Sequence, residues 1–197
     1  MFNIYFTYGV WAVRIIAGER KGISLKPVPG EITRPTTDKV KEAIFNMIGP
    51  YFQGGLGLDL YAGSGALGIE ALSRGLSKVI FVDRNSKAIQ TIKQNLERSK
   101  YNEYAEVYRN DAKNALKALK KRNIQFSYIF LDPPYHKKAF KEEIETLLTF
   151  YLLHKNGQII VEHSRELELP EIILGVSKQK REVYGSTVIS IFSYKEE

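Results

Sequence analysis

The sequence predicts an α/β protein with a mostly parallel sheet and helices on both of its faces. Three observations support this fold class. From residue 57 onward, short apolar segments alternate with amphipathic ones, as they do in parallel sheets that are covered on both sides. A glycine-rich segment follows the first apolar segment, and acidic residues end most of the others. Since ligands bind at the carboxyl edge of such sheets, these acids indicate a functional site there.

The N-terminal part precedes this alternation. Residues 1–12 are rich in aromatic residues and contain no Lys or Arg. They are too short for a membrane helix and lack the features of a secretory signal, so we expect a disordered extension or an added edge strand. Residues 13–55 form a second region, with a β-ribbon over 13–27 and a helix over 38–51 that Thr36 or Thr37 can cap.

Residues 56–197 form the main domain, and its elements follow the apolar pattern in chain order. We expect parallel strands at 58–61, 79–82, 105–109, 128–131 and 158–162. Helices are expected between them at 66–74, 86–99, 112–121 and 138–153, with Ser86 as a cap. Two apolar segments flank Gly185-Ser186 and predict a C-terminal antiparallel hairpin.

The composition excludes several classes of site. The chain of 197 residues has no cysteine and three histidines, so a disulfide framework, a thiolate zinc site and a cysteine nucleophile are excluded. We therefore expect no metal site. Its 29 basic and 22 acidic residues give a net charge of +7, which favours an anionic partner.

The segment Gly63-Ser64-Gly65-Ala66-Leu67-Gly68 fits the pattern G-x-G-x-x-G between a predicted strand and a predicted helix. Glycines allow a tight turn close to a ligand, and helix N–H groups favour a negative group. Asp83 lies twenty residues after Gly63, where its carboxylate can accept both hydroxyl protons of a ribose. A nicotinamide dinucleotide and S-adenosylmethionine both satisfy this pattern, and a packing role alone is the weaker alternative.

Two further acids favour S-adenosylmethionine. Asp59 lies four residues before Gly63, where it would repel a pyrophosphate and attract the α-ammonium group of S-adenosylmethionine. Asp111 could accept a hydrogen bond from the adenine amine, with the N–H of Ala112 at a ring nitrogen. Taken alone, Asp111 is equally well explained as a helix N-cap. Together the three acids suit a cationic ligand that contains adenosine.

Asp132-Pro133-Pro134-Tyr135 is the most specific motif in the chain. The prolines fix φ twice and remove two backbone donors, so the Asp132 carboxylate and the Pro133 carbonyl form a rigid pair of acceptors. Such a pair fits the two hydrogens of an exocyclic base amine, whose lone pair can then attack a sulfonium methyl group while Asp132 stabilises the positive charge. Tyr135 would stack on the base, which must be unpaired or flipped out.

Several segments together resemble the RsmD family, bacterial enzymes that methylate guanine N2 in small-subunit ribosomal RNA. These segments are 14–18, Arg34-Pro35-Thr36 with the helix through Asn46, 58–75, and the motif at 132–135. The resemblance runs from about residue 13 to the C-terminus and leaves residues 1–12 outside. Tyr61 stands where many relatives have Phe, a change that should not disturb the turn.

The resemblance implies the Rossmann-like class I methyltransferase fold, with a seven-stranded, mostly parallel sheet, a C-terminal antiparallel hairpin and an N-terminal ribbon and helix beside the cleft. It implies S-adenosyl-L-methionine as cofactor and one guanine of 16S rRNA as substrate, at position 966 in the family, within the small ribosomal subunit or an assembly intermediate. We further expect a cytoplasmic monomer with no membrane contact and no metal.

The motifs and the resemblance together assign candidate site residues. The predicted cofactor-binding residues are Asp59, Tyr61, Ala62, Gly63, Ser64, Gly65, Asp83, Arg84, Asp111 and Ala112. The predicted catalytic residues are Asp132, Pro133, Pro134 and Tyr135. The predicted RNA-binding residues are Arg34, Thr36, Lys137 and Lys138, of which the lysines would position phosphates without specifying sequence.

Three alternatives stay open at this point. The motif does not name the base, so adenine N6 or cytosine N4, in RNA or DNA, is the nearest enzymatic rival. A non-catalytic RNA-binding scaffold is a second alternative, although the intact acids at 59, 83 and 132 argue against it. A dinucleotide oxidoreductase is the third, and it leaves the motif at 132–135 without a purpose.

Overall fold

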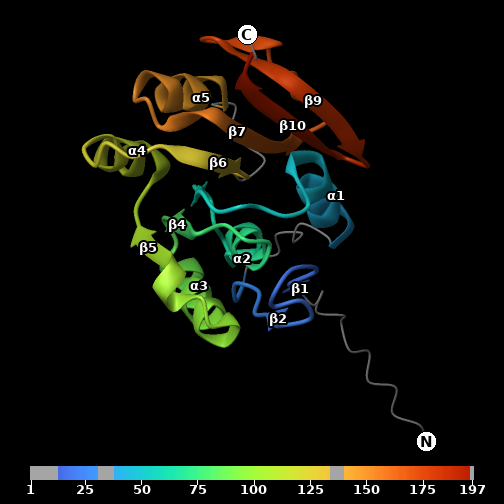
Figure 1. The fold of residues 1–197 in the computed structure, drawn as a ribbon, viewed down its shortest axis with the longest axis vertical. Coiled ribbons are helices and arrows are strands. Elements are labelled where there is room, and N and C mark those ends of the chain that lie inside the picture. The colour runs from blue at the N-terminus through green and yellow to red at the C-terminus, as the bar shows by residue number, and fades with distance from the viewer. Residues whose placement is uncertain (1–12, 31–37, 134–139, 196–197) are drawn as a thin grey trace, which may run out of the picture.

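The computed structural model describes residues 13–30, 38–133 and 140–195, and its central feature is one mixed sheet (Figure 1). Five neighbouring strands are parallel, and the last three run antiparallel. In spatial order the strands are β5 (Ala105–Arg109), β4 (Lys78–Asp83), β3 (Leu56–Asp59), β6 (Phe126–Leu131), β7 (Leu153–Ser164), β10 (Thr187–Tyr194), β9 (Val176–Tyr184) and β8 (Ile172–Ile173).

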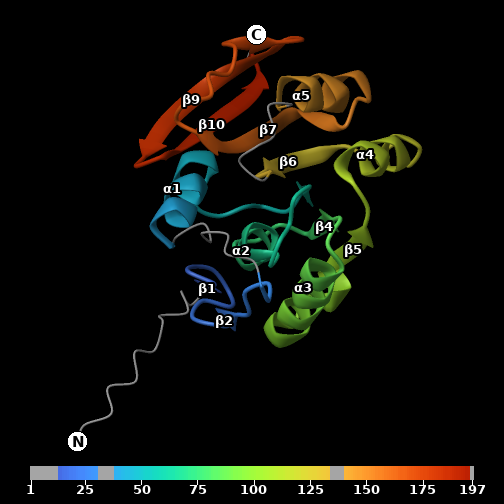
Figure 2. The same ribbon diagram turned by 180° about the vertical axis from the view of Figure 1, so that it is seen from behind.

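Helices cover both faces of this sheet (Figures 1 and 2). One face packs against α1 (Asp38–Ile48), α2 (Ala66–Ser73) and α3 (Ser86–Ser99), and the other against α4 (Ala112–Lys120) and α5 (Phe140–Thr149). A short 3₁₀ turn, Asn102–Tyr104, leads into β5. Because successive strand residues point to opposite faces, Phe130 of β6 lies in the core under α1, while Ile129 and Leu131 lie in the core under α4 and α5.

The α/β class with a mostly parallel sheet and a terminal hairpin is confirmed, with one difference in strand number. The sheet contains eight strands among the described residues, where seven were expected, because Ile172–Ile173 pairs with β9 at the edge. The last parallel strand also begins at Leu153, earlier than expected. The preceding helix ends at Thr149 and Tyr151 takes a left-handed φ of 56°, which stops a helix.

Two helix boundaries also differ from the sequence prediction. Helix α1 ends at Ile48, since Gly49 has φ 117° and Pro50 follows. The N-cap of α3 is Asn85, whose side chain accepts a hydrogen bond from the backbone N of Lys87 at 2.9 Å. The predicted cap, Ser86, is instead the first helical residue.

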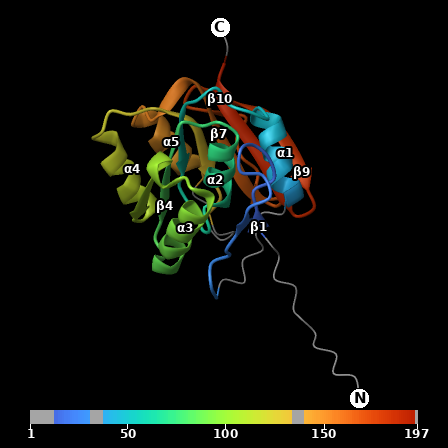
Figure 3. The ribbon, with the colours of Figure 1, turned by 60° about the horizontal axis from the view of Figure 1, so that its bottom comes forward.

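The N-terminal ribbon is present and docks on α2 (Figure 3). Its strands β1 (Val13–Arg14) and β2 (Ser24–Leu25) pair antiparallel. The carboxylate of Glu70, fully buried in α2, accepts hydrogen bonds from the backbone N of Ile16 at 2.8 Å and of Ala17 at 3.0 Å. Residues 1–12, for which we expected an extension, lie outside the described residues.

Two buried cations complete this junction. Arg74 Nε donates to Glu70 Oε1 at 2.8 Å, and its Nη1 donates to the carbonyl of Pro50 at 2.9 Å. Lys41 of α1 is only 1% exposed; its ammonium lies 3.6 Å from Glu70 Oε2 and donates to the carbonyl of Arg14. We call Lys41, Glu70 and Arg74 the ribbon junction, because they join the ribbon, α1 and α2.

In the part of the chain that the structure describes, no helix has both the length and the apolar character needed to cross a bilayer. The longest described helix, α3, has 14 residues and a polar outer face.

Candidate active site at the carboxyl edge of the sheet

The order of the strands places a topological switch point between β3 and β6. The chain proceeds outward from β3 to β4 and β5 on one side, and outward from β6 to β7 on the other. Ligands bind at such switch points, outside the carboxyl ends of the strands. Asp59 ends β3 and Asp132 directly follows β6, so two predicted site residues flank the switch point.

Asp59 is buried against the start of α2. Its side chain is 2% exposed, and its Oδ2 accepts a hydrogen bond from the backbone N of Gly68 at 3.1 Å. Burial raises the pKa of Asp59 to about 7, with a further increase from the charge of Asp83, while the Gly68 N–H works in the opposite direction. A carboxylate in this position would be stabilised by a cationic ligand group.

Asp132 is the second carboxyl group at the switch point. It is partly buried, and the adjacent Pro133 is buried. Burial raises the pKa of Asp132 well above its usual range, and the charges of Glu162 and Asp59 raise it further. Strongly perturbed carboxyl groups that gather in a crevice are a common feature of active sites.

Glu162 of β7 was not among the predicted site residues. It is 7% exposed and lies close enough to Asp132 to influence its pKa. Its position in the sequence did indicate a site residue, because Glu162 ends the predicted fifth strand as the other acids end theirs. We call Asp59, Asp132 and Glu162 the acidic edge.

The glycine turn connects β3 to α2 in the predicted place. Gly63 and Gly65 take left-handed φ values of 51° and 80°, which favour glycine. The N–H of Gly65 donates to the carbonyl of Ala62 at 2.6 Å. A Cβ built on Gly63 would meet no atom within 4 Å, whereas one on Gly68 would lie 2.3 Å from the ring of Phe81. The third glycine therefore serves packing, and the first borders open space.

Asp83 stabilises this turn. Its Oδ2 accepts from the backbone N of Gly63 at 2.9 Å and its Oδ1 from the backbone N of Asn85 at 2.8 Å. A carboxylate has about four acceptor positions, so both oxygens retain capacity for ribose hydroxyls. Asn95 of α3, which the sequence did not reveal, supports the turn by donating to the carbonyl of Ser64 at 2.9 Å.

Tyr61 has a contact that its sequence position did not indicate. Its hydroxyl donates a hydrogen bond to Glu143 of α5. Burial raises the pKa of this phenol, and the hydrogen bond and charge of Glu143 raise it further. The residue therefore links the turn after β3 to the helix that follows the motif at 132–135.

Asp111 lies at the N-terminus of α4 and acts as its N-cap. Its carboxylate accepts from the backbone N of Asn114 at 2.9 Å and from the side-chain Nδ2 of Asn114 at 2.6 Å. The N-cap alternative from the sequence is thus observed, and Ala112 is the first residue of the helix. Arg84 is exposed beside Asp83.

Six predicted site residues lie outside the described residues. They are Arg34, Thr36, Pro134, Tyr135, Lys137 and Lys138. Among the residues that the structure describes, no three His, Cys, Asp or Glu side chains are placed to hold a metal ion together.

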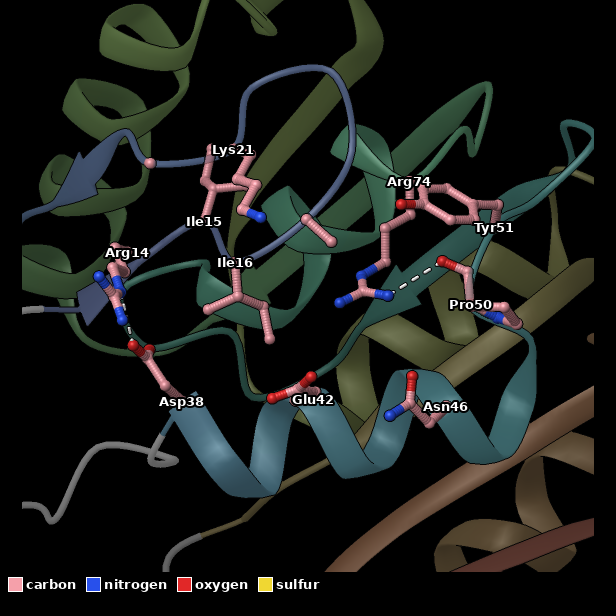
Figure 4. A pocket seen from close by; sticks show the side chains of 12 residues that line it. Arg14, Ile15, Ile16, Lys21, Asp38, Glu42, Asn46, Pro50, Tyr51 and Arg74 are labelled. Carbon is pink, nitrogen blue, oxygen red and sulfur yellow. Dashed lines mark hydrogen bonds and ion pairs between the residues drawn. The ribbon is translucent and has the colours of Figure 1, made fainter.

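A separate pocket of about 460 Å³ lies between the ribbon and α1 (Figure 4). Asp38, Glu42 and Asn46 line it from α1, and Arg14 and Lys21 from the ribbon. Arg14 Nε pairs with Asp38 Oδ2 at 2.7 Å, so these two opposite charges in the pocket lining balance each other. This pocket does not include the acidic edge.

Comparisons with known proteins agree on one family. A family model described as "Conserved hypothetical protein 95" matches residues 13–193. A Bacillus subtilis protein named "Putative rRNA methyltransferase YlbH" is 54% identical over 180 residues, which cover 91% of this chain and 98% of that protein. A Haemophilus influenzae protein named "Ribosomal RNA small subunit methyltransferase D" is 39% identical over 158 residues, or 80% and 81% of the two chains.

A solved structure gives the same result for the fold. The structure titled "Putative methyltransferase yhhF from Escherichia coli" aligns with a TM-score of 0.79 and 31% identity, covering 94% of this chain and 99% of that one. The sheet, its helices and the terminal hairpin thus form a class I methyltransferase fold.

Proposed function

Because the chain belongs to the RsmD family, the family of the matching model and of the relatives above, we propose that it transfers a methyl group from S-adenosylmethionine to the exocyclic N2 amine of a guanine in 16S rRNA. Relatives that cover most of the chain are named as rRNA methyltransferases, which supports the RNA class. The guanine at position 966 is the specific proposal, within the small subunit or an assembly intermediate.

The observation that carries the proposal is that the glycine turn and Asp132 follow neighbouring strands at the carboxyl edge of the sheet. The turn after β3 and the motif after β6 lie on neighbouring strands, since the N of Leu60 donates to the carbonyl of Phe130 at 3.2 Å. A cofactor on the turn and an amine on Asp132 would therefore be neighbours.

The described residues fit S-adenosylmethionine. The buried carboxyl group of Asp59 suits a cationic group, Asp83 has acceptors for ribose hydroxyls, and the space beside Gly63 is open. When bound, this cofactor supplies an electrophilic methyl group.

The chain's own residues would then orient the amine. The Asp132 carboxylate and the Pro133 carbonyl accept hydrogen bonds from its two hydrogens, so that its lone pair points toward the methyl carbon. Fixed acceptors stabilise the charge that develops on the amine. Asp132 would also take the proton that the amine loses once it has been methylated.

The test is incubation of the protein with methyl-labelled S-adenosylmethionine and small subunits from cells that lack the activity, followed by mapping of the modified nucleoside. We expect label in N2-methylguanine at one site of 16S rRNA. Label in adenine or cytosine, or only in DNA, would assign another amine substrate. The absence of label from every nucleic acid would reject the activity.

A further inference from the structure

Strand register places Asp132 and Glu162 side by side. Strands β6 and β7 are parallel, and Leu131 pairs with Val161. Asp132 and Glu162 each follow one of these paired residues. Neighbouring strands lie about 4.8 Å apart, so the two acids occupy adjacent positions at the carboxyl edge.

Alternation along β7 also determines the face to which Glu162 points. Leu131 and Val161 pack in the core under α4 and α5, and successive residues of a strand point to opposite faces. His163, the next residue of β7, is again on the α5 face, with its ring 6.2 Å from that of Phe140. Glu162 therefore faces the side of α1 and α2.

Among the described residues, acidic groups face this pair from β3 and β9. Lys180 of β9 is also on this face, and its ammonium donates a hydrogen bond to the carbonyl of Met47. Asp59 contributes a carboxyl group from β3, and Glu182 of β9 lies further out on the same face, with Ile189 of β10 between it and Glu162 in register. Glu182 is exposed. Lys41, the buried cation of α1, is engaged by Glu70 and the carbonyl of Arg14. Among the described residues, the influences on the pKa of Asp132 all raise it.

Resting on the proposed function, we propose that Glu162 acts with Asp132 as a carboxylate pair that accepts the proton lost by the methylated amine. After the N–C bond has formed, an N–H bond breaks, its electron pair stays on nitrogen, and the proton passes to Asp132. Glu162 is a positioning residue: its negative charge makes Asp132 a stronger base, because two adjacent carboxylates are stabilised when they hold one proton between them.

The variant Glu162→Gln tests this role, because it keeps the size of the side chain and removes the charge. Without that charge the pKa of Asp132 falls, so the carboxylate persists to lower pH. The single-turnover rate of methyl transfer to small subunits should fall at low pH, as Asp132 becomes protonated. In Glu162→Gln this acid limb of the pH–rate profile should lie about one pH unit or more lower than in the wild type. The affinity for S-adenosylmethionine should stay unchanged.

Glu182→Gln is the matched control, since it removes the same charge from the same face at an exposed position. Its acid limb should coincide with that of the wild type. If Glu162→Gln does not fold, Glu162→Asp replaces it: the shorter side chain moves the carboxylate away, and the limb should move in the same direction by less.

A second readout does not need turnover. The ¹³C NMR titration of the Asp132 carboxyl group, assigned by its loss in Asp132→Asn, should have a lower midpoint in Glu162→Gln than in the wild type. If the wild type is active and Glu162→Gln shifts neither the acid limb of the pH–rate profile nor the midpoint of the Asp132 titration, the role of Glu162 is overturned. The proposed function then stays intact. A wild type that transfers no methyl group at any pH overturns both.

Discussion

The ribbon junction and the acidic edge both contain buried charged groups, and the two regions treat them in opposite ways. At the ribbon junction, the Glu70 carboxylate has two cations and two backbone N–H groups as partners. At the acidic edge, Asp132 lies near two further carboxyl groups, and Asp59 has one backbone donor. The first arrangement surrounds a carboxylate with cations and backbone donors, and the second brings like charges together, whose repulsion a cationic ligand or a bound proton would relieve.

This difference indicates which buried charges serve stability and which serve chemistry. Charges that are fully paired hold elements together, and removing one partner is costly because the other stays buried. Like charges gathered in a crevice reduce stability, and proteins tolerate such costs mainly at functional sites. The comparison can be tested by changing one residue at a time in each region.

The largest expected effect is on stability, from Glu70→Ala. The substitution removes the carboxylate that Lys41 and Arg74 share and leaves Lys41 only Asp38, at 4.0 Å. We expect the free energy of unfolding to fall by about 3–5 kcal/mol. Denaturant titration measures this change. Glu97→Ala, an exposed glutamate of α3, is the control and should stay within about 0.5 kcal/mol of the wild type. If the two variants lowered the free energy of unfolding equally, the paired charges of the ribbon junction would not stabilise the fold. The contrast with the acidic edge would then disappear.

Asp59 should instead destabilise the folded protein at high pH. Its pKa is raised from 3.8 to about 7, so the folded state binds this proton more tightly than the unfolded state. Stability then falls as pH rises from about 4 to about 7, by roughly 4 kcal/mol at ~1.4 kcal/mol for each pKa unit. Asp59→Asn keeps an oxygen for the Gly68 N–H and should flatten this dependence, as urea titrations at pH 5 and pH 8 would measure. A steeper slope in the variant would contradict this assignment.

Asp132→Ala should separate catalysis from binding. Loss of a contact made to the developing charge is expected to lower turnover at least about a hundredfold, while the affinity for S-adenosylmethionine stays near that of the wild type. Single-turnover assays and calorimetry measure the two quantities. An equal loss of affinity and rate would place Asp132 in cofactor binding instead.

Asp83→Ala should have a smaller effect, on cofactor affinity. The backbone N–H groups of Gly63 and Asn85 lose their acceptor, and the ribose would lose one as well. At about 1–3 kcal/mol for such a loss, affinity should fall about tenfold to a hundredfold. Calorimetry that finds unchanged affinity would show that the turn binds no ribose at this residue.

The parts of the fold that the sequence predicted well depend on local patterns. Fully buried strands are continuous apolar segments, and β4, β5 and β6 begin and end within two residues of the prediction. Strand β8 has only two residues and exists through its pairing with β9, so no local pattern reveals it. The end of α5 depends on the left-handed Tyr151, a conformation that this residue type does not indicate.

The candidate site also has features that local sequence predicts and features that depend on contacts between distant residues. The spacing of Asp59, Gly63 and Asp83 predicted the strand ends and the turn, because each is set by neighbours in the chain. The contacts of Tyr61 with Glu143 and of Asn95 with Ser64 join residues 82 and 31 positions apart. The juxtaposition of Asp132 and Glu162 depends on which strands are neighbours, and a single sequence does not state that order.

The docking of the ribbon has a consequence for protein synthesis. Ile16 and Ala17 bond to a carboxylate more than 50 residues further along the chain, and Lys26 bonds to Asn95, 69 residues away. These residues leave the ribosome early, yet their partners are translated seconds later at about 5–20 residues per second. The ribbon therefore cannot complete its hydrogen bonds until α2 and α3 have emerged.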